Sequence, residues 1–453
     1  MTKTTQSINP YNGETLAGYK GWDNERTDRA VKVAGEAFAQ WSKFPISERA
    51  TYFHKLASLL REEKEECARL ITQEMGKLIH ESKGEVDKCA WVCEYYADNA
   101  EQFLAPIDKP SDASKSYVRF DPTGVVFGIM PWNFPFWQAF RYIAPTLMAG
   151  NTTVMKHASN VWGCGEKIES LFQKAGFPDG AFQHVLIGSD QAERIIANPA
   201  VQGVTLTGSE PAGKSVASLA GKYLKKSVLE LGGSDPFVVL SDASVEEAAA
   251  TAVKARLLNA GQSCIAAKRF IVHKKVADDF LHCLISEVSH LKVGDPLNEQ
   301  TNLAPMSRED LAEELEEQVN LSIQEGAKIV LGGGREGTHF SPYILTHAAP
   351  GMPAFDEELF GPVFPVAVVQ DDEEALALAN KTTFGLGASV WTQNAQLQEK
   401  AARMIESGAV FINSMVKSDP RLPFGGVKIS GYGRELAEFG IREFTNIKTV
   451  YVD

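Results

Sequence analysis

The chain has 453 residues, of which 44% are hydrophobic and 23% charged, ordinary values for a globular chain of roughly two or three domains. Its formal net charge of −13, without a dense Lys/Arg block, argues against nucleic-acid binding. Met1–Glu14 lacks the apolar centre of a signal peptide, and the most apolar stretch, 125–137, is too short and too interrupted by proline to span a bilayer. We therefore expect a cytoplasmic protein with neither a membrane nor a nucleic-acid partner.

The N-terminal part of the chain is expected to be mainly helical. Residues 27–103 carry apolar side chains at helical spacing, with charged faces between them. A polar loop over 111–116 and an extended segment over 117–120 follow, and this excursion is typical of a hairpin that leaves its domain.

Strand-like and helical runs alternate from Val125 onward, and this order predicts a parallel, doubly wound sheet. The alternation restarts after Gly233 and continues to about Phe411, so we predict two α/β domains joined near Gly232-Gly233. The tail, 445–453, predicts a terminal strand that either joins an oligomer interface or docks at a sheet edge. The expected strands cover 125–130, 152–155, 203–207, 228–231, 237–240 and 269–273, and helices are expected up to 148, up to 176 and over 212–224.

The six cysteines lack the regular spacing of a disulfide framework, so we expect most of them to be buried small hydrophobic residues. Cys89 and Cys93 lie four residues apart on a predicted helix without further ligands nearby, and no metal site is expected.

Cys264 differs from the other cysteines because it lies in a polar loop before a predicted strand. Ser244 and Glu247 form a capping box at the start of the preceding helix, 244–258, and Gly261 is placed to end that helix. Cys264 is therefore a candidate nucleophile. The alternative is an inert loop cysteine, since no neighbouring histidine supplies a base.

Glu230 is a candidate general base, because it lies between leucines at the end of an apolar strand, where desolvation would raise its pKa. The glycines Gly232 and Gly233 permit close backbone approach at a cleft. A glutamate that turns to solvent at the strand end is the alternative.

A strand, a glycine turn and a helix N-terminus meet at Thr207-Gly208-Ser209, an arrangement that favours an anion. The segment is not a G-x-G-x-x-G fingerprint, so an ordinary strand-to-helix turn is the alternative.

Asn133 lies among aromatic residues and prolines in 130–137, where its amide is suited to stabilising an oxyanion. Arg141 follows on the next predicted helix and could hold a carboxylate with two parallel hydrogen bonds. A helix-capping asparagine and a surface salt bridge are the respective alternatives.

Together these motifs resemble the aldehyde dehydrogenase superfamily, from Asn9-Pro10 to about Thr449. The segments MPWNFPFWQAFR, KHASN and MVKSDPRLPFGG look most like those of bacterial and cyanobacterial succinate-semialdehyde dehydrogenases. The resemblance is carried by 74–77 (EMGK), 131–135 (PWNFP), Lys156, 206–209 (LTGS), 229–233 (LELGG), 261–264 (GQSC), 357–362 (EELFGP), 423–426 (PFGG) and Ser430-Gly431.

The resemblance implies an α/β fold of three parts. A Rossmann-like cofactor-binding domain would comprise 1–110 and 124–232, and a catalytic domain would comprise 233–430. A small β arm, 111–123 with 445–453, would form the interface of a homodimer or homotetramer.

The resemblance also implies residue roles, position by position. Cys264 would attack the aldehyde as a thiolate, and Asn133 and the Cys264 N–H would hold the thiohemiacetal oxyanion. Glu230 would activate the water that hydrolyses the thioester. The residues implied to contact the cofactor are Trp132, Lys156, Ser159, Gly208, Ser209, Leu231, Glu358 and Phe360.

NADP⁺ is the expected cofactor, with NAD⁺ as second choice. Relatives that prefer NAD⁺ often have a glutamate at the position of Ser159, and that carboxylate would repel a 2′-phosphate. The small, neutral Ser159 leaves room, and Lys156 adds positive charge.

The resemblance implies oxidation of succinate semialdehyde to succinate, with Arg141 and Ser418 at the substrate carboxylate and Trp137 and Phe424 as apolar walls. Another aldehyde, such as glutarate semialdehyde, is the alternative. Two alternatives come from other classes of protein: a structural protein without activity, like the lens crystallins of this superfamily, and a cysteine hydrolase that needs no cofactor.

Overall fold

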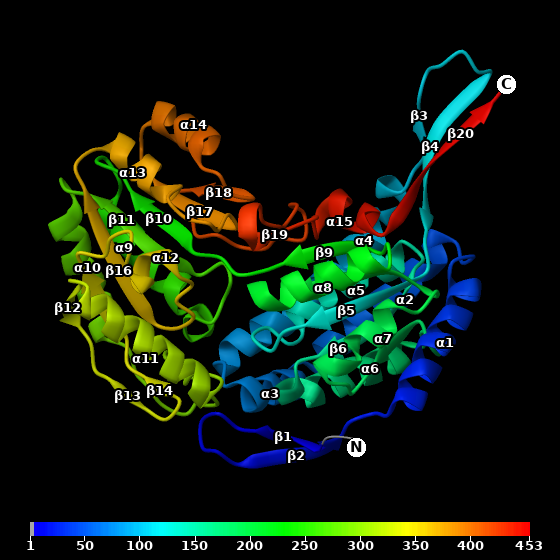
Figure 1. Ribbon diagram of the computed structural model, residues 1–453, viewed down its shortest axis with the longest axis horizontal. Helices are drawn as coiled ribbons and strands as arrows, with labels where there is room; N and C mark the ends of the chain where they lie inside the picture. Colours follow the sequence, from blue (N-terminus) through cyan, green and yellow to red (C-terminus); the bar gives the residue numbers. More distant parts are fainter. Residues whose placement is uncertain (1–3) are drawn as a thin grey trace.

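The computed structural model describes residues 4–453, which form two α/β lobes and a projecting β ribbon (Figure 1). The first lobe contains a six-stranded sheet in the order β19-β9-β8-β5-β6-β7, in which β19 is antiparallel to β9 and the other neighbours are parallel. Its strands are β5 (Val125–Met130), β6 (Thr152–His157), β7 (Phe182–His184), β8 (Val201–Thr207), β9 (Lys226–Glu230) and β19 (Gly431–Tyr432).

Helices pack around this sheet because their apolar sides are buried against it and against one another. All twelve residues of α5 are buried, which makes it the central helix of the lobe. The helices are α1 (Asn24–Trp41), α2 (Ile46–Glu62), α3 (Lys64–Met75), α4 (Ile79–Phe103), α5 (Trp137–Met148), α6 (Trp162–Ala175), α7 (Ala192–Ile196), α8 (Glu210–Lys222) and α15 (Ala437–Glu443).

The second lobe contains a seven-stranded sheet in the order β12-β15-β16-β11-β10-β17-β18, with β12 antiparallel at its edge. Its strands are β10 (Asp235–Val239), β11 (Ala267–His273), β12 (Lys328–Leu331), β15 (Tyr343–Thr346), β16 (Val363–Val369), β17 (Gly387–Trp391) and β18 (Ala409–Ile412). Its helices are α9 (Val245–Leu257), α10 (Ala277–Ser289), α11 (Glu309–Gln324), α12 (Pro353–Asp356), α13 (Asp372–Ala379) and α14 (Ala395–Met404).

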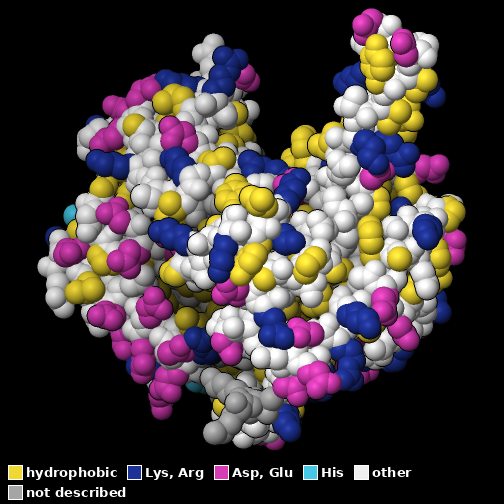
Figure 2. Space-filling view, turned by 45° about the vertical axis from the view of Figure 1, so that its right-hand side comes forward, with side chains coloured by type: hydrophobic (Ala, Val, Ile, Leu, Met, Phe, Trp, Pro, Cys, Tyr) yellow, Lys and Arg dark blue, Asp and Glu magenta, His cyan; other side chains and the backbone are white. Residues whose placement is uncertain are grey.

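The projecting ribbon, which we call the arm, pairs β4 (Lys115–Pro122) with β20 (Thr445–Val452) along their full lengths, and the short β3 (Ile107–Asp108) lies beside β4. Hydrophobic side chains lie on its surface in Figure 2. Two further hairpins are β1 (Thr4–Ile8) with β2 (Thr15–Lys20), and β13 (Arg335–Glu336) with β14 (His339–Phe340).

The predicted α/β fold with parallel, doubly wound sheets is confirmed, with local differences from the sequence-based expectations. β7 was missed, because its three residues (FQH) at the sheet edge are too few to give a strand pattern. Ser244 does precede α9, yet its side chain makes no capping hydrogen bond, so the capping box is absent.

The N-terminal prediction for Met1–Glu14 falls partly outside the described residues, since the structure describes the chain from Thr4. Within residues 4–453, no helix is both long enough and apolar enough to cross a membrane.

Candidate active site

Cys264 lies in a sharply turned loop between α9 and β11. The helix ends at Leu257, and then Asn259, Ala260 and Gly261 all have positive φ angles, of 57°, 52° and 81°. Gly261 is needed there, because a Cβ on it would lie 2.5 Å from the Gly361 carbonyl oxygen. The expectation that Gly261 itself ends the helix is therefore wrong. Gly261 is the last of three residues with positive φ, and this turn changes the direction of the chain between the helix and Cys264.

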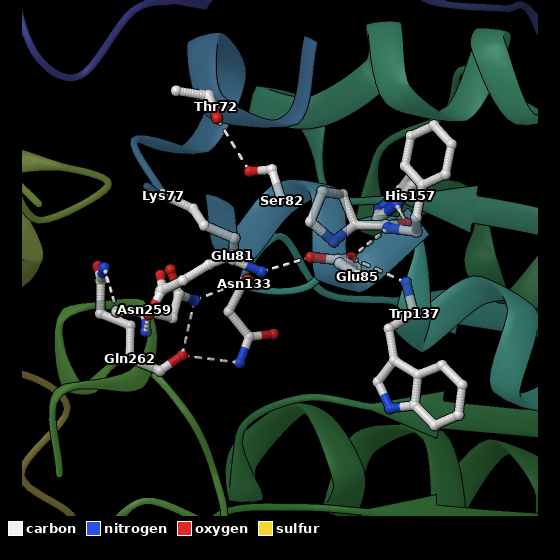
Figure 3. Close-up of polar contacts among 12 residues, drawn as sticks. Thr72, Lys77, Glu81, Ser82, Glu85, Asn133, Trp137, His157, Asn259 and Gln262 are labelled. Carbon is white, nitrogen blue, oxygen red and sulfur yellow. Dashed lines mark hydrogen bonds and ion pairs between the residues drawn. The ribbon is translucent and has the colours of Figure 1, made fainter. Parts of the chain in front are cut away.

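Hydrogen bonds from both lobes hold this loop (Figure 3). The Asn133 amide Nδ2 donates to the Gln262 carbonyl over 3.0 Å, and the Asn259 amide Nδ2 donates to the Asn133 carbonyl over 2.7 Å. The Asn259 backbone N–H donates to the Glu81 carboxylate over 3.1 Å. Asn133 is thus locked beside the cysteine loop, and an amide has two N–H donors, so one remains for an oxyanion.

Glu85 on α4 fixes the segment that carries Asn133 (Figure 3). Its carboxylate accepts the backbone N–H groups of Phe136 and Trp137, each over 2.8 Å, at the N-terminus of α5. Lys77 forms a fully buried ion pair with the same carboxylate and lies 3.6 Å from the centre of the Phe134 ring. Lys77 of the EMGK segment therefore helps to hold the segment that carries Asn133, a role that could not be assigned from the sequence.

Two cavities meet at Cys264 and Gln138, which line both. The larger, of about 430 Å³, lies between the lobes and is lined by residues from the ends of β5, β8 and β9 and by Glu358 and Phe360. The smaller, of about 260 Å³, is lined from α4, α5 and the segment before α15, and includes Lys88, Arg141 and Ser418. We call them the cofactor-side cavity and the substrate-side cavity.

The surroundings of Cys264 set the charge on its thiol. Burial raises the pKa of Cys264 to about 12, while the cations Arg141 and Lys268 oppose that rise. Lys268 donates to the carbonyls of Ser263 and Cys264 over 2.7 and 2.8 Å and lies 3.2 Å from the Glu358 carboxylate. Lys268 thus links the cysteine loop to the cofactor-side cavity, and sequence reasoning missed it because it falls inside an ordinary strand.

Glu230 is 2% exposed, so it does not turn to solvent. Neither carboxylate oxygen has a hydrogen-bond partner within residues 4–453. Burial, followed by repulsion from Glu435, raises the pKa of Glu230 well above its ordinary value. A glutamate with a raised pKa is a stronger proton acceptor, once ionised, than an ordinary glutamate.

The residues expected to contact the cofactor divide into two groups. Trp132, Gly208, Ser209, Leu231, Glu358 and Phe360 all line the cofactor-side cavity. Within it, the Trp132 and Phe360 rings meet edge to face at 6.0 Å, and Glu358 accepts the Gly233 N–H over 3.0 Å. Ser209 precedes α8 without capping it, so the helix N-terminus faces the cavity with unpaired donors.

Lys156 and Ser159 lie outside that cavity, at and just after the carboxyl end of β6. Lys156 is half-buried, and burial lowers the pKa of its ammonium. Ser159 is exposed. Both residues lie at the carboxyl end of the sheet, on and just after β6, which pairs with β5, the strand that leads into Trp132 and Asn133.

The predicted substrate residues Arg141, Trp137, Ser418 and Phe424 all line the substrate-side cavity. Arg141 is only 1% exposed, forms an ion pair with the buried Glu435, and donates to the Thr207 hydroxyl over 3.1 Å. It does not form the surface salt bridge that was the alternative. Its guanidinium also lies 4.5 Å from the centre of the Phe424 ring.

Comparisons with known proteins agree with this arrangement. Residues 1–450 match the model of the aldehyde dehydrogenase family. The chain is 48% identical to a Synechocystis protein described as probable succinate-semialdehyde dehydrogenase (NADP+), covering 98% of this chain and 99% of that one. It is 45% identical to succinate-semialdehyde dehydrogenase (NADP+) 1 of Mycobacterium tuberculosis, over 98% and 99% of the two chains.

The fold matches solved structures equally well. The crystal structure of succinic semialdehyde dehydrogenase from Streptococcus pyogenes in complex with NADP+ superimposes with a TM-score of 0.97 at 38% identity, covering 99% of each chain. On this evidence the chain belongs to the aldehyde dehydrogenase family.

Proposed function

We propose that this chain oxidises succinate semialdehyde to succinate and uses NADP⁺ as its hydride acceptor. The observation that carries the proposal is the position of Cys264, which lies where the cofactor-side cavity meets a second cavity whose lining includes Lys88 and Arg141. The relatives named above support the same substrate and cofactor.

Several features of the structure support the fit of this cofactor. The cofactor-side cavity ends at the N-terminus of α8, where backbone N–H groups and the helix dipole favour a pyrophosphate. Ser159 is small, neutral and exposed, and Lys156 lies three residues before it, so a 2′-phosphate would meet no carboxylate from that position. Glu358 and Phe360 would hold the nicotinamide end.

The reaction proceeds through a covalent bond to Cys264. The Cys264 thiol releases its proton to water, its thiolate adds to the aldehyde carbon, and the Asn133 amide and the Cys264 N–H hold the resulting oxyanion. When bound, NADP⁺ supplies the acceptor for the hydride that leaves this thiohemiacetal. The thioester that remains is hydrolysed by water, whose proton passes to Glu230, and succinate leaves as the thiol is restored.

The experiment that tests this function is a panel of aldehydes with the wild-type protein and Arg141→Ala. Wild-type kcat/KM should be highest for succinate semialdehyde. The Arg141→Ala variant should lose far more activity on that substrate than on butanal, because only the semialdehyde has a carboxylate to bind. Equal losses on both aldehydes would remove Arg141 from this role, and a preference for glutarate semialdehyde would replace the proposed substrate.

We also propose the three-part organisation and a homo-oligomer. The organisation assigns 1–110 and 124–232 to cofactor binding, 233–430 to catalysis, and 111–123 with 445–453 to subunit contact. The two separate sheets and the projecting arm support it. A dimer or tetramer acting in the cytoplasm, on a small aldehyde that bears a carboxylate, completes the proposal.

A further inference from the structure

Lys88, which the sequence analysis did not single out, lines the substrate-side cavity from α4. Its ammonium Nζ donates to the Ser418 hydroxyl oxygen over 2.7 Å and lies 4.0 Å from the centre of the Trp137 ring. Lys88 therefore touches two of the residues already assigned to the substrate.

The charges around this cavity leave Lys88 without a carboxylate partner. Arg141 is already paired with the buried Glu435. The two acidic residues that act on Lys88 most, Glu85 and Asp419, are themselves paired with Lys77 and Arg421.

Within residues 4–453 Lys88 forms no ion pair, although its ammonium is half-buried. A half-buried cation without a partner is costly, and an incoming anion relieves that cost. Lys417 is the other unpaired cation on this cavity, but it is exposed, where solvent and salt screen its charge.

Ser418 completes the arrangement. Its hydroxyl oxygen accepts from the Lys88 ammonium over 2.7 Å and from the Trp137 indole N–H over 3.0 Å. Because both acceptor positions of the oxygen are used, its own hydrogen is left to donate to a third group. A carboxylate oxygen is the acceptor that this hydroxyl and the ammonium could share.

We propose that Lys88, with Ser418, binds the carboxylate of the substrate and supplies the net positive charge that Arg141, already paired with Glu435, does not. Lys88 is then a specificity-determining residue that favours semialdehydes with a distal carboxylate over neutral aldehydes. This inference rests on the proposed function. Burial, and then repulsion from Arg141, lowers the pKa of Lys88 to about 8. A bound carboxylate would counter both effects, because its negative charge favours the charged ammonium.

The test compares Lys88→Met with wild type on succinate semialdehyde and on butanal, each with saturating NADP⁺. For the semialdehyde, KM should rise about 10- to 100-fold with a smaller change in kcat, because a charge-assisted hydrogen bond made in the ground state is lost. The loss in kcat/KM should be at least about tenfold greater than for butanal. Lys88→Arg should restore much of the preference.

One further measurement and two comparison variants distinguish a role in binding from a role in structure. Succinate should inhibit butanal oxidation by the wild type, and its inhibition constant should rise in Lys88→Met by a factor similar to that of KM. Lys83→Met is the matched control: it is on the same helix, but Lys83 pairs with Glu65 and Glu299 away from the cavity, so neither constant should change. Lys417→Met should have a smaller effect than Lys88→Met.

The outcomes distinguish the inference from the function beneath it. A wild-type protein without preference for succinate semialdehyde would overturn the proposed function. The role of Lys88 alone would be overturned if the wild type has that preference but Lys88→Met loses the same factor in kcat/KM on both aldehydes, or binds succinate with an unchanged inhibition constant. The proposed function would then still hold.

Discussion

At the scale of single residues, the carboxyl of Glu230 shows how burial prepares a group for chemistry. It is removed from water, and the negative charge of Glu435 opposes its ionisation, so the pKa of Glu230 lies above the ordinary range of a glutamate. Only the ionised form can accept a proton from water.

The hydrolysis of the thioester should therefore accelerate as the pH rises through the raised pKa of Glu230. We expect a hydrolysis rate, measured after the first turnover, that increases from acidic to alkaline pH. Glu435→Gln should move the rise to lower pH, because it removes the repelling charge and frees Arg141 to stabilise the Glu230 carboxylate. A rate that does not change with pH would contradict the assignment of Glu230 as the base.

We propose that Ser159 determines the choice of cofactor. Ser159→Glu should lower kcat/KM for NADP⁺ by about 10- to 100-fold, since the new carboxylate would repel the 2′-phosphate, and should improve the relative use of NAD⁺ by bonding the ribose hydroxyls. Steady-state kinetics with both cofactors measure this, and Ser159→Ala is the uncharged control. A wild type with the higher kcat/KM for NAD⁺ would overturn the cofactor preference itself.

At the scale of secondary-structure elements, the arm projects from its lobe (Figure 1) and carries exposed apolar side chains. A ribbon of two strands is only marginally stable in water on its own. In this one the side chains of Ile447, Tyr451 and Val452 have exposed fractions of 61%, 52% and 46%. Those side chains would be covered if the arm packed against another subunit.

Replacing both Ile447 and Tyr451 by Asp should dissociate the oligomer, because charges would then enter an apolar contact. Light scattering coupled to gel filtration measures the mass. Leu224→Asp is the matched control, since Leu224 is 92% exposed but lies at the end of α8, away from the arm. A monomeric wild type, or an assembly unaffected by the two aspartates, would contradict the proposed use of the arm.

The elements also show how far sequence reasoning reaches. β5 was predicted with the bounds that it has, because an apolar β-branched run ends at a proline segment. The Cys264 loop was found from its polar composition between a helix and a strand. Sequence reasoning assigned no role to four residues of the site: Lys77, Glu85, Lys88 and Lys268. Each acts through a contact with a residue distant in the chain, and no local sequence pattern specifies such a contact.

At the scale of the whole molecule, the two lobes each contribute half of the site. The first lobe provides Asn133, Glu230, Arg141 and the N-terminus of α8, and the second lobe provides the Cys264 loop, Lys268 and Glu358. The hydrogen bonds between Asn133 and the 259–262 turn join the lobes at the reacting centre. A shift of one lobe against the other would therefore separate Cys264, the proposed nucleophile, from Asn133, its proposed oxyanion donor.

The most direct test of the account is to trap the covalent intermediate. Glu230→Gln keeps the shape of the side chain but removes the base, so the thioester should form and then persist. After mixing with succinate semialdehyde and NADP⁺, intact-protein mass spectrometry should show one succinyl group per chain, mapped by peptide analysis to Cys264, with an equimolar burst of NADPH. Formation of NADPH without an adduct, or an adduct on another cysteine, would contradict the account.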